Sequence, residues 1–255
     1  MSDIGRYVYG VVSAPSGSVT PQAHGIDPIY DVELLKRGPL AAITSRVRVA
    51  QLSPESDNAG IVDLALRHEH VLESFLVAGL SVLPFRFGTL CASDGDVTEL
   101  LEINEAPLSR ALRAVRGKLE MGVRIMVDRD ELRESVLESD VELSRRQREI
   151  ATLSPGAGHL RRKQLERTLA ERVASEATRR VAALHADISG NAAAARLEGG
   201  GDDAVAVAAY LVPIERIDGF AADAHVLAAE AGLRIRVTGP WPPYSFASVE
   251  AHEEQ

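Results

Sequence analysis

The sequence contains little cysteine and few aromatic residues. Cys91 is the single cysteine, and phenylalanine, tyrosine and tryptophan together make up 4% of the 255 residues. One cysteine cannot form a disulfide within the chain, and one thiol cannot by itself make a metal site. This usage favours a protein of a reducing compartment, and we expect a cytoplasmic location.

Long hydrophobic runs and an excess of basic residues are also missing. No segment approaches the roughly 18 apolar residues of a membrane-spanning helix, and the first residues lack the basic and apolar regions of a signal peptide. The 28 lysine and arginine residues are outnumbered by 37 acidic residues, which gives a net charge of −9. We therefore expect no membrane association, and no nucleic-acid binding because phosphates require a basic surface.

Sequence patterns of catalytic and cofactor sites are missing as well. The run Gly199-Gly200-Gly201 lacks the Lys-Ser/Thr ending of a P-loop and precedes a strand pattern where a helix is required. No nucleophile-elbow sequence occurs. His68 has no second histidine, cysteine or acid pair at the spacing of metal ligands. We expect no catalytic residue, no cofactor, no metal and no small-molecule substrate.

The sequence does contain the composition and patterning of a globular α/β protein. Hydrophobic residues make up 45% and charged residues 25%, which is typical of soluble domains. In the first half, apolar runs predict strands over 6–13, 29–35, 40–47 and 81–87. Helical spacing predicts helices over 61–78 and over 96–119, the second broken near Pro107. This β–β–β–α–β–α order is close to one ferredoxin-like unit.

The second half repeats this pattern around a long helical insertion. Strands are predicted over 121–127, 204–212 and 233–238, and a helix that ends at Gly232 precedes the last one. Strong helix formers between the first two strands predict an antiparallel hairpin of 130–153 and 159–188. Its apolar stripe is narrow, which suits a two-helix seam. The stripe consists of Leu165, Leu169, Val173, Ala177, Val181, Leu184 and Ile188.

These patterns predict an α/β (α+β) fold of two ferredoxin-like domains. Residues 1–118 form the first domain and residues 119–255 the second, which carries the helical hairpin at about 130–188. Charges support the hairpin, because acids begin its first arm and bases dominate the second. We expect Glu134 to lie level with Arg179 and Glu138 within a turn of Arg172. Each exposed pair contributes about 0–1 kcal/mol.

His68 lies near the middle of the apolar face of the 61–78 helix. It is either a core histidine, hydrogen-bonded to backbone or to a carboxylate, or a ligand or general base. No partner residue at ligand spacing supports the second interpretation. Glu69 and Glu73 lie off the apolar face, and we expect both to be solvated.

Arg86 alternates with two aromatic residues in the predicted strand over 81–87. Strand geometry puts Phe85 and Phe87 on one face and Arg86 on the other. If that second face meets the other domain, Arg86 forms a buried, bidentate pair with a carboxylate there. The alternatives are an exposed arginine and an arginine that binds an anionic ligand.

The most distinctive segment is Gly239-Pro240-Trp241-Pro242-Pro243-Tyr244-Ser245-Phe246, which surrounds the only tryptophan with prolines. Proline fixes its own φ and favours extended geometry in the residue before it. We expect a stiff, irregular strap that neither continues a helix nor lies in a central strand. Its aromatic side chains are expected to be buried and to dock the C-terminal segment. These are Trp241, Tyr244 and Phe246.

Three sequence blocks resemble the gas vesicle protein F/L family (GvpF/GvpL). Thr238-Gly239-Pro240-Trp241-Pro242-Pro243-Tyr244-Ser245-Phe246 is similar to the family's carboxy-terminal signature. Val82-Leu83-Pro84-Phe85-Arg86-Phe87-Gly88-Thr89 is similar to its mid-chain motif, which also follows a helix that carries a histidine. Tyr7-Val8-Tyr9-Gly10-Val11-Val12 is similar to its first strand. The blocks follow the family's order and span almost the full chain.

The resemblance implies an accessory or minor component in the assembly of gas vesicles, the gas-filled protein shells that give cells buoyancy. It also implies contact with the small hydrophobic shell protein, two ferredoxin-like units with a helical insertion, and no enzyme activity. We expect the structural or interaction motif to comprise Phe85, Arg86, Phe87, Gly88, Gly239, Pro240, Trp241, Pro242, Pro243, Tyr244 and Phe246. His68 is expected to be a buried polar residue.

The favoured hypothesis is a gas vesicle assembly protein that binds the shell protein through open strand edges or an apolar patch. Other gas vesicle accessory proteins are further possible partners. The alternative is a cytoplasmic enzyme or small-molecule-binding protein, since ferredoxin-like scaffolds carry many functions. That alternative requires a pocket with convergent polar groups. A third hypothesis makes the helical hairpin a general coiled-coil adaptor.

Overall fold

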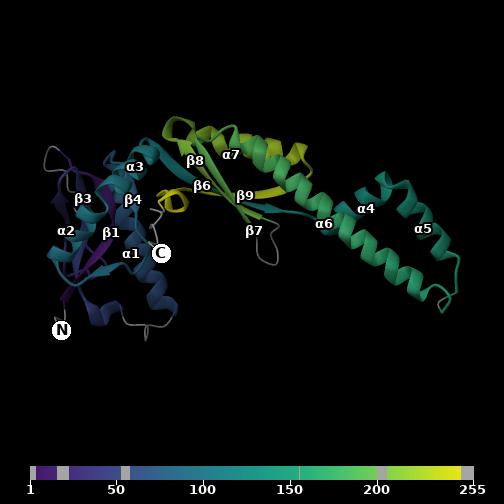
Figure 1. Ribbon diagram of the computed structural model, residues 1–255, viewed down its shortest axis with the longest axis horizontal. Coiled ribbons are helices and arrows are strands. Elements are labelled where there is room, and N and C mark those ends of the chain that lie inside the picture. The colour runs from purple at the N-terminus through teal and green to yellow at the C-terminus, as the bar shows by residue number, and fades with distance from the viewer. Residues whose placement is uncertain (1–3, 16–22, 53–57, 155, 200–205, 248–255) are drawn as a thin grey trace. The chain divides into compact units, whose positions relative to one another are not determined.

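The chain forms two compact units in a computed structural model, which describes residues 4–15, 23–52, 58–154, 156–199 and 206–247 (Figure 1). The first unit is Met1–Glu120 with Pro240–Gln255, and the second is Met121–Gly239. The prediction assigned 240–255 to the second domain, whereas the described part of this segment packs with the first unit. Spatial packing, and not chain order, defines a compact unit.

The first unit is built around one sheet, with the strand order β2-β3-β1-β4 and with β5 also paired to β1. Its strands are β1 (Ile4–Ser13), β2 (Val32–Arg37), β3 (Leu40–Arg48), β4 (Val82–Pro84) and β5 (Leu90–Cys91). Its helices are η1 (Val49–Leu52), α1 (Asn58–Val77), α2 (Asp94–Ile103), α3 (Glu105–Val115) and η3 (Tyr244–Phe246). β1, β2 and β3 pair antiparallel, so sequence neighbours form the centre of the sheet.

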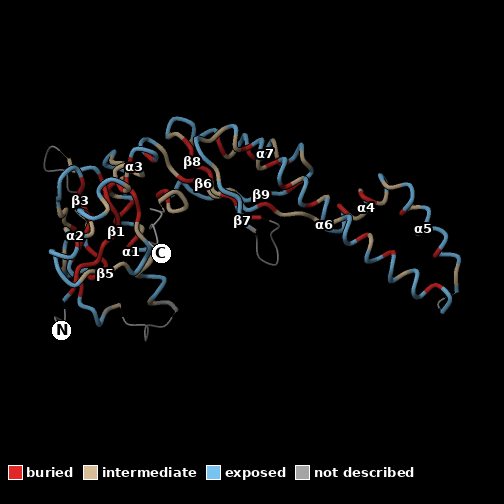
Figure 2. Tube along the Cα trace, viewed as in Figure 1, coloured by how far each residue is buried: buried red, intermediate tan, exposed pale blue. Residues whose placement is uncertain are grey.

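The central strand β1 is buried from Gly5 to Val12, as the colours of Figure 2 show. A register shift between Val8 and Gly10 changes the alternation of side chains along the strand. Helix α1 packs on one face of β1, against Tyr7, Tyr9 and Val12. Helices α2 and α3 also contact β1. Because a strand buried at every position must be covered on both faces, this sheet is covered on both sides.

One glycine of β1 is required by a close approach of two strands. A Cβ atom at Gly10 would lie 2.6 Å from the carbonyl oxygen of Leu83 in β4. That distance is shorter than any van der Waals contact, so a side chain at this position would separate the strands. Gly10 therefore allows β4, and the segment that follows it, to lie against β1.

The predicted elements of the first unit are confirmed in type, with three corrections. The strand predicted over 81–87 is limited to the three residues of β4. The helical region over 96–119 is two helices that meet at Asn104, because Pro107 lies in the first turn of α3, where proline is tolerated. On α1, Ile61 is exposed, whereas Val71 is buried.

The second unit contains a four-stranded sheet with the order β7-β8-β6-β9. Its strands are β6 (Lys118–Met126), β7 (Ala194–Gly199), β8 (Ala206–Pro213) and β9 (Arg234–Trp241). Its helices are α4 (Arg129–Ser139), α5 (Val141–Ala151), α6 (His159–Ser189), η2 (Ile214–Arg216) and α7 (Ile217–Glu230). Side chains of α6 and α7 pack on alternate residues of the strands, among them Val123, Tyr210 and Ile235. Helices therefore cover one face of this sheet.

The helical insertion differs from the predicted two-armed hairpin. Its first arm is two helices, because Asp140 has extended geometry at φ −100° and ψ 94°. The Asp140 carboxylate accepts hydrogen bonds from the N–H groups of Glu142 and Leu143, so it is the N-cap of α5. The predicted apolar stripe of α6 is buried, except that Val173 is partly exposed.

The charged pairs of the insertion also differ from the prediction. Arg133 of α4 pairs with Glu166 of α6 through two hydrogen bonds of 2.8 Å. Arg179, which we expected opposite Glu134, pairs instead with Glu176 of its own helix. Ion pairs at the surface contribute little free energy. The buried apolar residues, and not these pairs, therefore decide how the helices of the insertion align.

Strand β7 was not predicted. Its residues, Ala-Ala-Arg-Leu-Glu-Gly, include good helix formers and no β-branched residue. The pairing with β8 over six positions overrides that propensity. With β7 included, the second unit has the order β–α–β–β–α–β of a ferredoxin-like fold. In the first unit, residues 23–31 between β1 and β2 contain no helix. The ferredoxin-like assignment of both units stays a prediction.

Candidate functional site

All three sequence blocks meet around Tyr7 in the first unit. The Tyr7 hydroxyl accepts a hydrogen bond of 2.9 Å from the N–H of Gly88. It also lies 3.0 Å from Nδ1 of His68 on α1. The ring centroids of Phe87 and Tyr244 lie 6.0 and 6.4 Å from that of His68. We call Tyr7, His68, Phe87 and Tyr244 the aromatic cluster.

His68 is the polar centre of the aromatic cluster. Its side chain is buried, and burial lowers the pKa of its imidazole to about 4, although the backbone of Phe85 offsets part of the shift. The ring is therefore neutral at pH 7. Of the two groups that contact the Tyr7 hydroxyl, only Nδ1 can accept its proton. We therefore assign Tyr7 as the donor to Nδ1 and place the ring proton on Nε2. Nε2 makes no hydrogen bond with the described residues.

Tyr244 fastens the C-terminal segment to α1. Its hydroxyl donates a hydrogen bond of 2.5 Å to Oε1 of Glu69. Burial raises the pKa of the Glu69 carboxyl, and the bond from Tyr244 opposes that rise. Oε2 of Glu69 is buried and makes no hydrogen bond with the described residues. The expectation that Glu69 is solvated is wrong, because the docked segment covers it.

Ser245 makes a second attachment. Its N–H donates to Oε2 of Glu120 at 2.8 Å, and its hydroxyl donates to Oε1 at 2.7 Å. Glu120 is 9% exposed, so both bonds are shielded from water and are stronger than surface bonds. The sequence did not indicate that Glu69 or Glu120 binds the C-terminal segment, because each carboxylate accepts these hydrogen bonds only when that segment packs beside it.

The predicted strap has a different backbone from the one expected. Gly239, Pro240 and Trp241 continue β9, which is an edge strand, where proline is allowed. Only the residues that follow are irregular. Pro242 and Pro243 are buried, Tyr244 and Phe246 are partly buried, and Trp241 is 41% exposed. Trp241 is therefore not the buried anchor that we expected.

The mid-chain motif leaves the sheet after Pro84. Phe85 is partly buried, whereas Arg86, Phe87 and Gly88 are exposed. The buried ion pair proposed for Arg86 is therefore wrong; its carbonyl, and not its side chain, makes a contact, by accepting bonds from Thr89. The strand is too short for the alternation on which the prediction relied.

The buried arginine of the first unit is Arg6, which the sequence did not single out. It is 4% exposed and lies on β1, where its guanidinium pairs with Asp94 and with Glu33. These hydrogen bonds outweigh burial and raise the pKa of Arg6. An arginine at the start of an otherwise apolar strand was the available signal.

Neither a metal site nor a membrane span is present in the part of the chain that the structure describes. No group of three or more histidine, cysteine, aspartate or glutamate residues is placed to hold a metal ion. None of the described helices is both long and apolar enough to cross a membrane.

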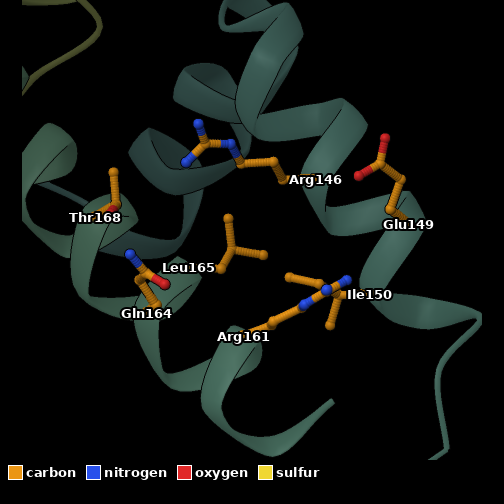
Figure 3. A pocket seen from close by; sticks show the side chains of 7 residues that line it. All are labelled: Arg146, Glu149, Ile150, Arg161, Gln164, Leu165 and Thr168. Carbon is orange, nitrogen blue, oxygen red and sulfur yellow. The ribbon is translucent and has the colours of Figure 1, made fainter. Parts of the chain in front are cut away.

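A pocket of about 250 Å³ lies between α5 and α6 in the helical insertion. Figure 3 shows Leu165 in its middle and the side chain of Arg161 extending toward Ile150. Arg146 lies beside it and is already paired with Glu142 at 2.9 Å. Since a ligand site requires polar groups that converge on one molecule, this pocket does not support the small-molecule hypothesis.

Comparison with known proteins identifies the family. Residues 5–248 match the family described as "Gas vesicle synthesis protein GvpL/GvpF". The chain belongs to this family. Among its GvpL/GvpF relatives are gas vesicle protein L and gas vesicle protein F of Streptomyces sp. (strain CB03234). The first is 30% identical over 98% of this chain and 96% of its own, and the second is 33% identical over 94% and 98%.

Solved structures show the same fold. The crystal structure of GvpF from Anabaena sp. PCC7120 matches with a TM-score of 0.77 at 21% identity, over 97% of this chain and 99% of that one. GvpF from Microcystis aeruginosa matches with a TM-score of 0.70 at 23% identity, over 96% and 99%. The mixed α/β architecture is therefore that of GvpF, and family membership associates the protein with gas vesicles.

Proposed function

We propose that this protein takes part in gas vesicle formation by binding the small hydrophobic shell protein, without catalysing a reaction. Membership of the GvpL/GvpF family supports the process. The site supports a binding role, because the aromatic cluster fastens a chain segment and its histidine is a buried, neutral core residue. We further propose that the Phe85–Gly88 and Gly239–Phe246 motifs act by closing the first unit.

The observation that carries the proposal is the outer edge of β7. The sheet of the second unit ends in β7 on one side and in β9 on the other. β9 carries Arg234, Arg236 and Pro240, which discourage pairing with another strand. β7 carries one arginine and one glutamate, and its Leu197 is 40% exposed. No described strand pairs with its outer edge, so β7 can accept an added strand from a partner.

A small hydrophobic subunit matches such an edge. Backbone groups of β7 provide hydrogen bonds, and Leu197, which is 40% exposed, provides apolar contact. Binding by strand addition also protects the partner from pairing with further copies of itself before assembly. The proposed location is the gas vesicle and the cytoplasm around it.

The test is co-purification with the shell protein, comparing wild type with Leu197→Lys. Lysine on an edge strand opposes strand addition, and we expect about a tenfold or greater loss of captured shell protein, or about 1.4 kcal/mol. Val226→Lys is the matched control, because Val226 is 58% exposed on α7, away from that edge. Wild-type protein that captures no shell protein during its polymerisation would overturn the proposal.

A further inference from the structure

The second unit leaves one face of its sheet open. Helices α6 and α7 pack on the face that includes Val123, Tyr210 and Ile235. Neighbouring residues in each strand point to the other face, because side chains alternate along a strand. The residues on this second face are Gly122, Arg124, Met126, Ala194, Arg196, Glu198, Val207, Ala209, Leu211, Arg234, Arg236 and Thr238. Its arginines and Val207 are exposed, whereas Leu211 is buried, so the open part of this face is the part that carries the arginines.

The open face is basic, although the whole chain has a net charge of −9. It carries Arg124, Arg196, Arg234 and Arg236, which we call the basic face, and one acid, Glu198. Arg234 pairs at 3.0 Å with Asp128, which follows β6. Arg124 and Arg236 make no ion pair with any residue that the structure describes.

The two unpaired arginines lie on adjacent strands. A Cβ atom at Gly122 of β6 would lie 2.7 Å from Oγ1 of Thr238 in β9, so these residues are opposite each other. Two residues further along antiparallel strands, Arg124 and Arg236 are opposite as well. Like charges in directly opposed positions destabilise a sheet. A bound anion between the two guanidinium groups would remove that repulsion.

The chemistry of the basic face selects the kind of anion. Guanidinium groups bind carboxylates through paired hydrogen bonds. Val207 and Ala209 on β8 place apolar surface on the same face, which suits a protein segment better than a free anion. No aromatic residue lies on this face, and base stacking requires one.

We propose that the basic face binds an acidic segment of a partner protein, with glutamate or aspartate side chains between Arg124 and Arg236 and apolar side chains on Val207 and Ala209. Charge complementarity carries the proposal, since this surface is basic on an acidic chain. The contacts proposed for this segment lie on β6, β8 and β9 and not on the outer edge of β7, so the inference does not rest on the proposed function.

The experiment measures fluorescence polarisation of a short labelled peptide of repeating Glu-Val-Glu-Ala with the full chain. The variant R124Q/R236Q is compared with R161Q/R167Q, which removes the same charge from two exposed positions of α6. We expect about a tenfold or greater increase in Kd for R124Q/R236Q, and less than about a twofold change for R161Q/R167Q. The Tm of R124Q/R236Q should equal or exceed that of wild type, because a repulsion is removed.

Three results would overturn the proposal. Wild-type protein that does not bind the acidic peptide contradicts it directly. Equal losses in the two double variants would show a general charge effect in place of a site. Tighter binding of labelled single-stranded DNA than of the peptide would assign the face to a different class of partner.

Discussion

Helices cover the sheets of the two units differently, although the strand order is similar. In both sheets the first strand of the unit, β1 or β6, has a strand on each side. In the first unit, β1 is buried at every inner position. In the second, burial alternates over the first four residues of β8 and of β9, although Leu211 further along β8 is buried. A sheet that is covered on both sides has no free face for a partner, whereas a sheet that is covered on one side has one free face. This difference in coverage agrees with the proposed binding role of the second unit.

Each unit also contains one histidine bonded to a core tyrosine. His68 lies 3.0 Å from the Tyr7 hydroxyl, and His185 lies 2.9 Å from the Tyr210 hydroxyl. Burial lowers the pKa of both imidazoles. Of these two histidines, only His68 is covered by the docked C-terminal segment, through Tyr244. The histidine–tyrosine pair is therefore enclosed in the first unit and partly exposed in the second.

The largest expected loss of stability comes from an aspartate in the sheet of the first unit, and the same substitution in the sheet of the second unit is its comparison. Val8→Asp buries a carboxylate at a position with 0% exposure, and we expect a loss of more than about 4 kcal/mol of unfolding free energy. Val207→Asp lies on the open face at 38% exposure and should cost less than about 1 kcal/mol. Urea unfolding measures both. A comparable loss for Val207→Asp would show that the second face is covered.

Acid should weaken the first unit through His68. In the unfolded chain this histidine takes up a proton near pH 6.5, but in the folded chain only near pH 4. The unfolded state therefore binds more protons between these values, and stability falls as pH falls from about 6.5 to 4. The loss approaches about 3 kcal/mol. The fluorescence of Trp241, the only tryptophan, can follow unfolding.

Glu69 acts in the opposite direction and must be removed to isolate that effect. Its raised pKa favours the neutral carboxyl, so its contribution is lost as pH rises above its unfolded value near 4.5. The pH series should therefore be measured in Glu69→Gln, which keeps an acceptor for Tyr244. Adding His68→Gln should flatten the remaining dependence; an unchanged slope would assign it to other groups.

Loss of the Tyr244 hydroxyl should have an intermediate effect. Tyr244→Phe leaves the partly buried Glu69 carboxylate without its donor, and we expect a loss of about 1–3 kcal/mol. Chemical denaturation checks this value. Tyr30→Phe is the control, because its hydroxyl makes no hydrogen bond with the described residues. Equal, small losses in both variants would mean that the C-terminal segment is not fastened by this bond.

The smallest effect is expected in the helical insertion. Asp140→Ala removes the N-cap of α5 and should cost about 0.5–2 kcal/mol, confined to the insertion. Hydrogen exchange of α5 amides, compared with those of α6, measures it locally. Glu138→Ala, an exposed neighbour with no capping bond, should leave exchange unchanged. Faster exchange throughout the second unit would show that the insertion and the sheet unfold together.

Prediction from the sequence succeeded where apolar residues repeat at helical spacing over a long segment. It failed where the structure of a segment depends on contacts with another part of the chain. The helices around His68 and Leu169 follow repeated apolar spacing that only a helix satisfies. Strand β7 failed because its alanine-rich residues favour helix in isolation, and only β8 makes them a strand. Arg6 was missed because its acidic partners lie 27 and 88 residues away.

By itself, the amino-acid sequence determined the mixed α/β class, the long helices, the absence of disulfides and, through three blocks, the family. These follow from local spacing and residue identity, which do not depend on distant contacts. The tertiary structure decided that Glu69 and Glu120 receive the C-terminal segment, that Trp241 remains partly exposed, and that one sheet keeps an open basic face. Each depends on which surface another segment covers, and burial is a property of neighbours in space.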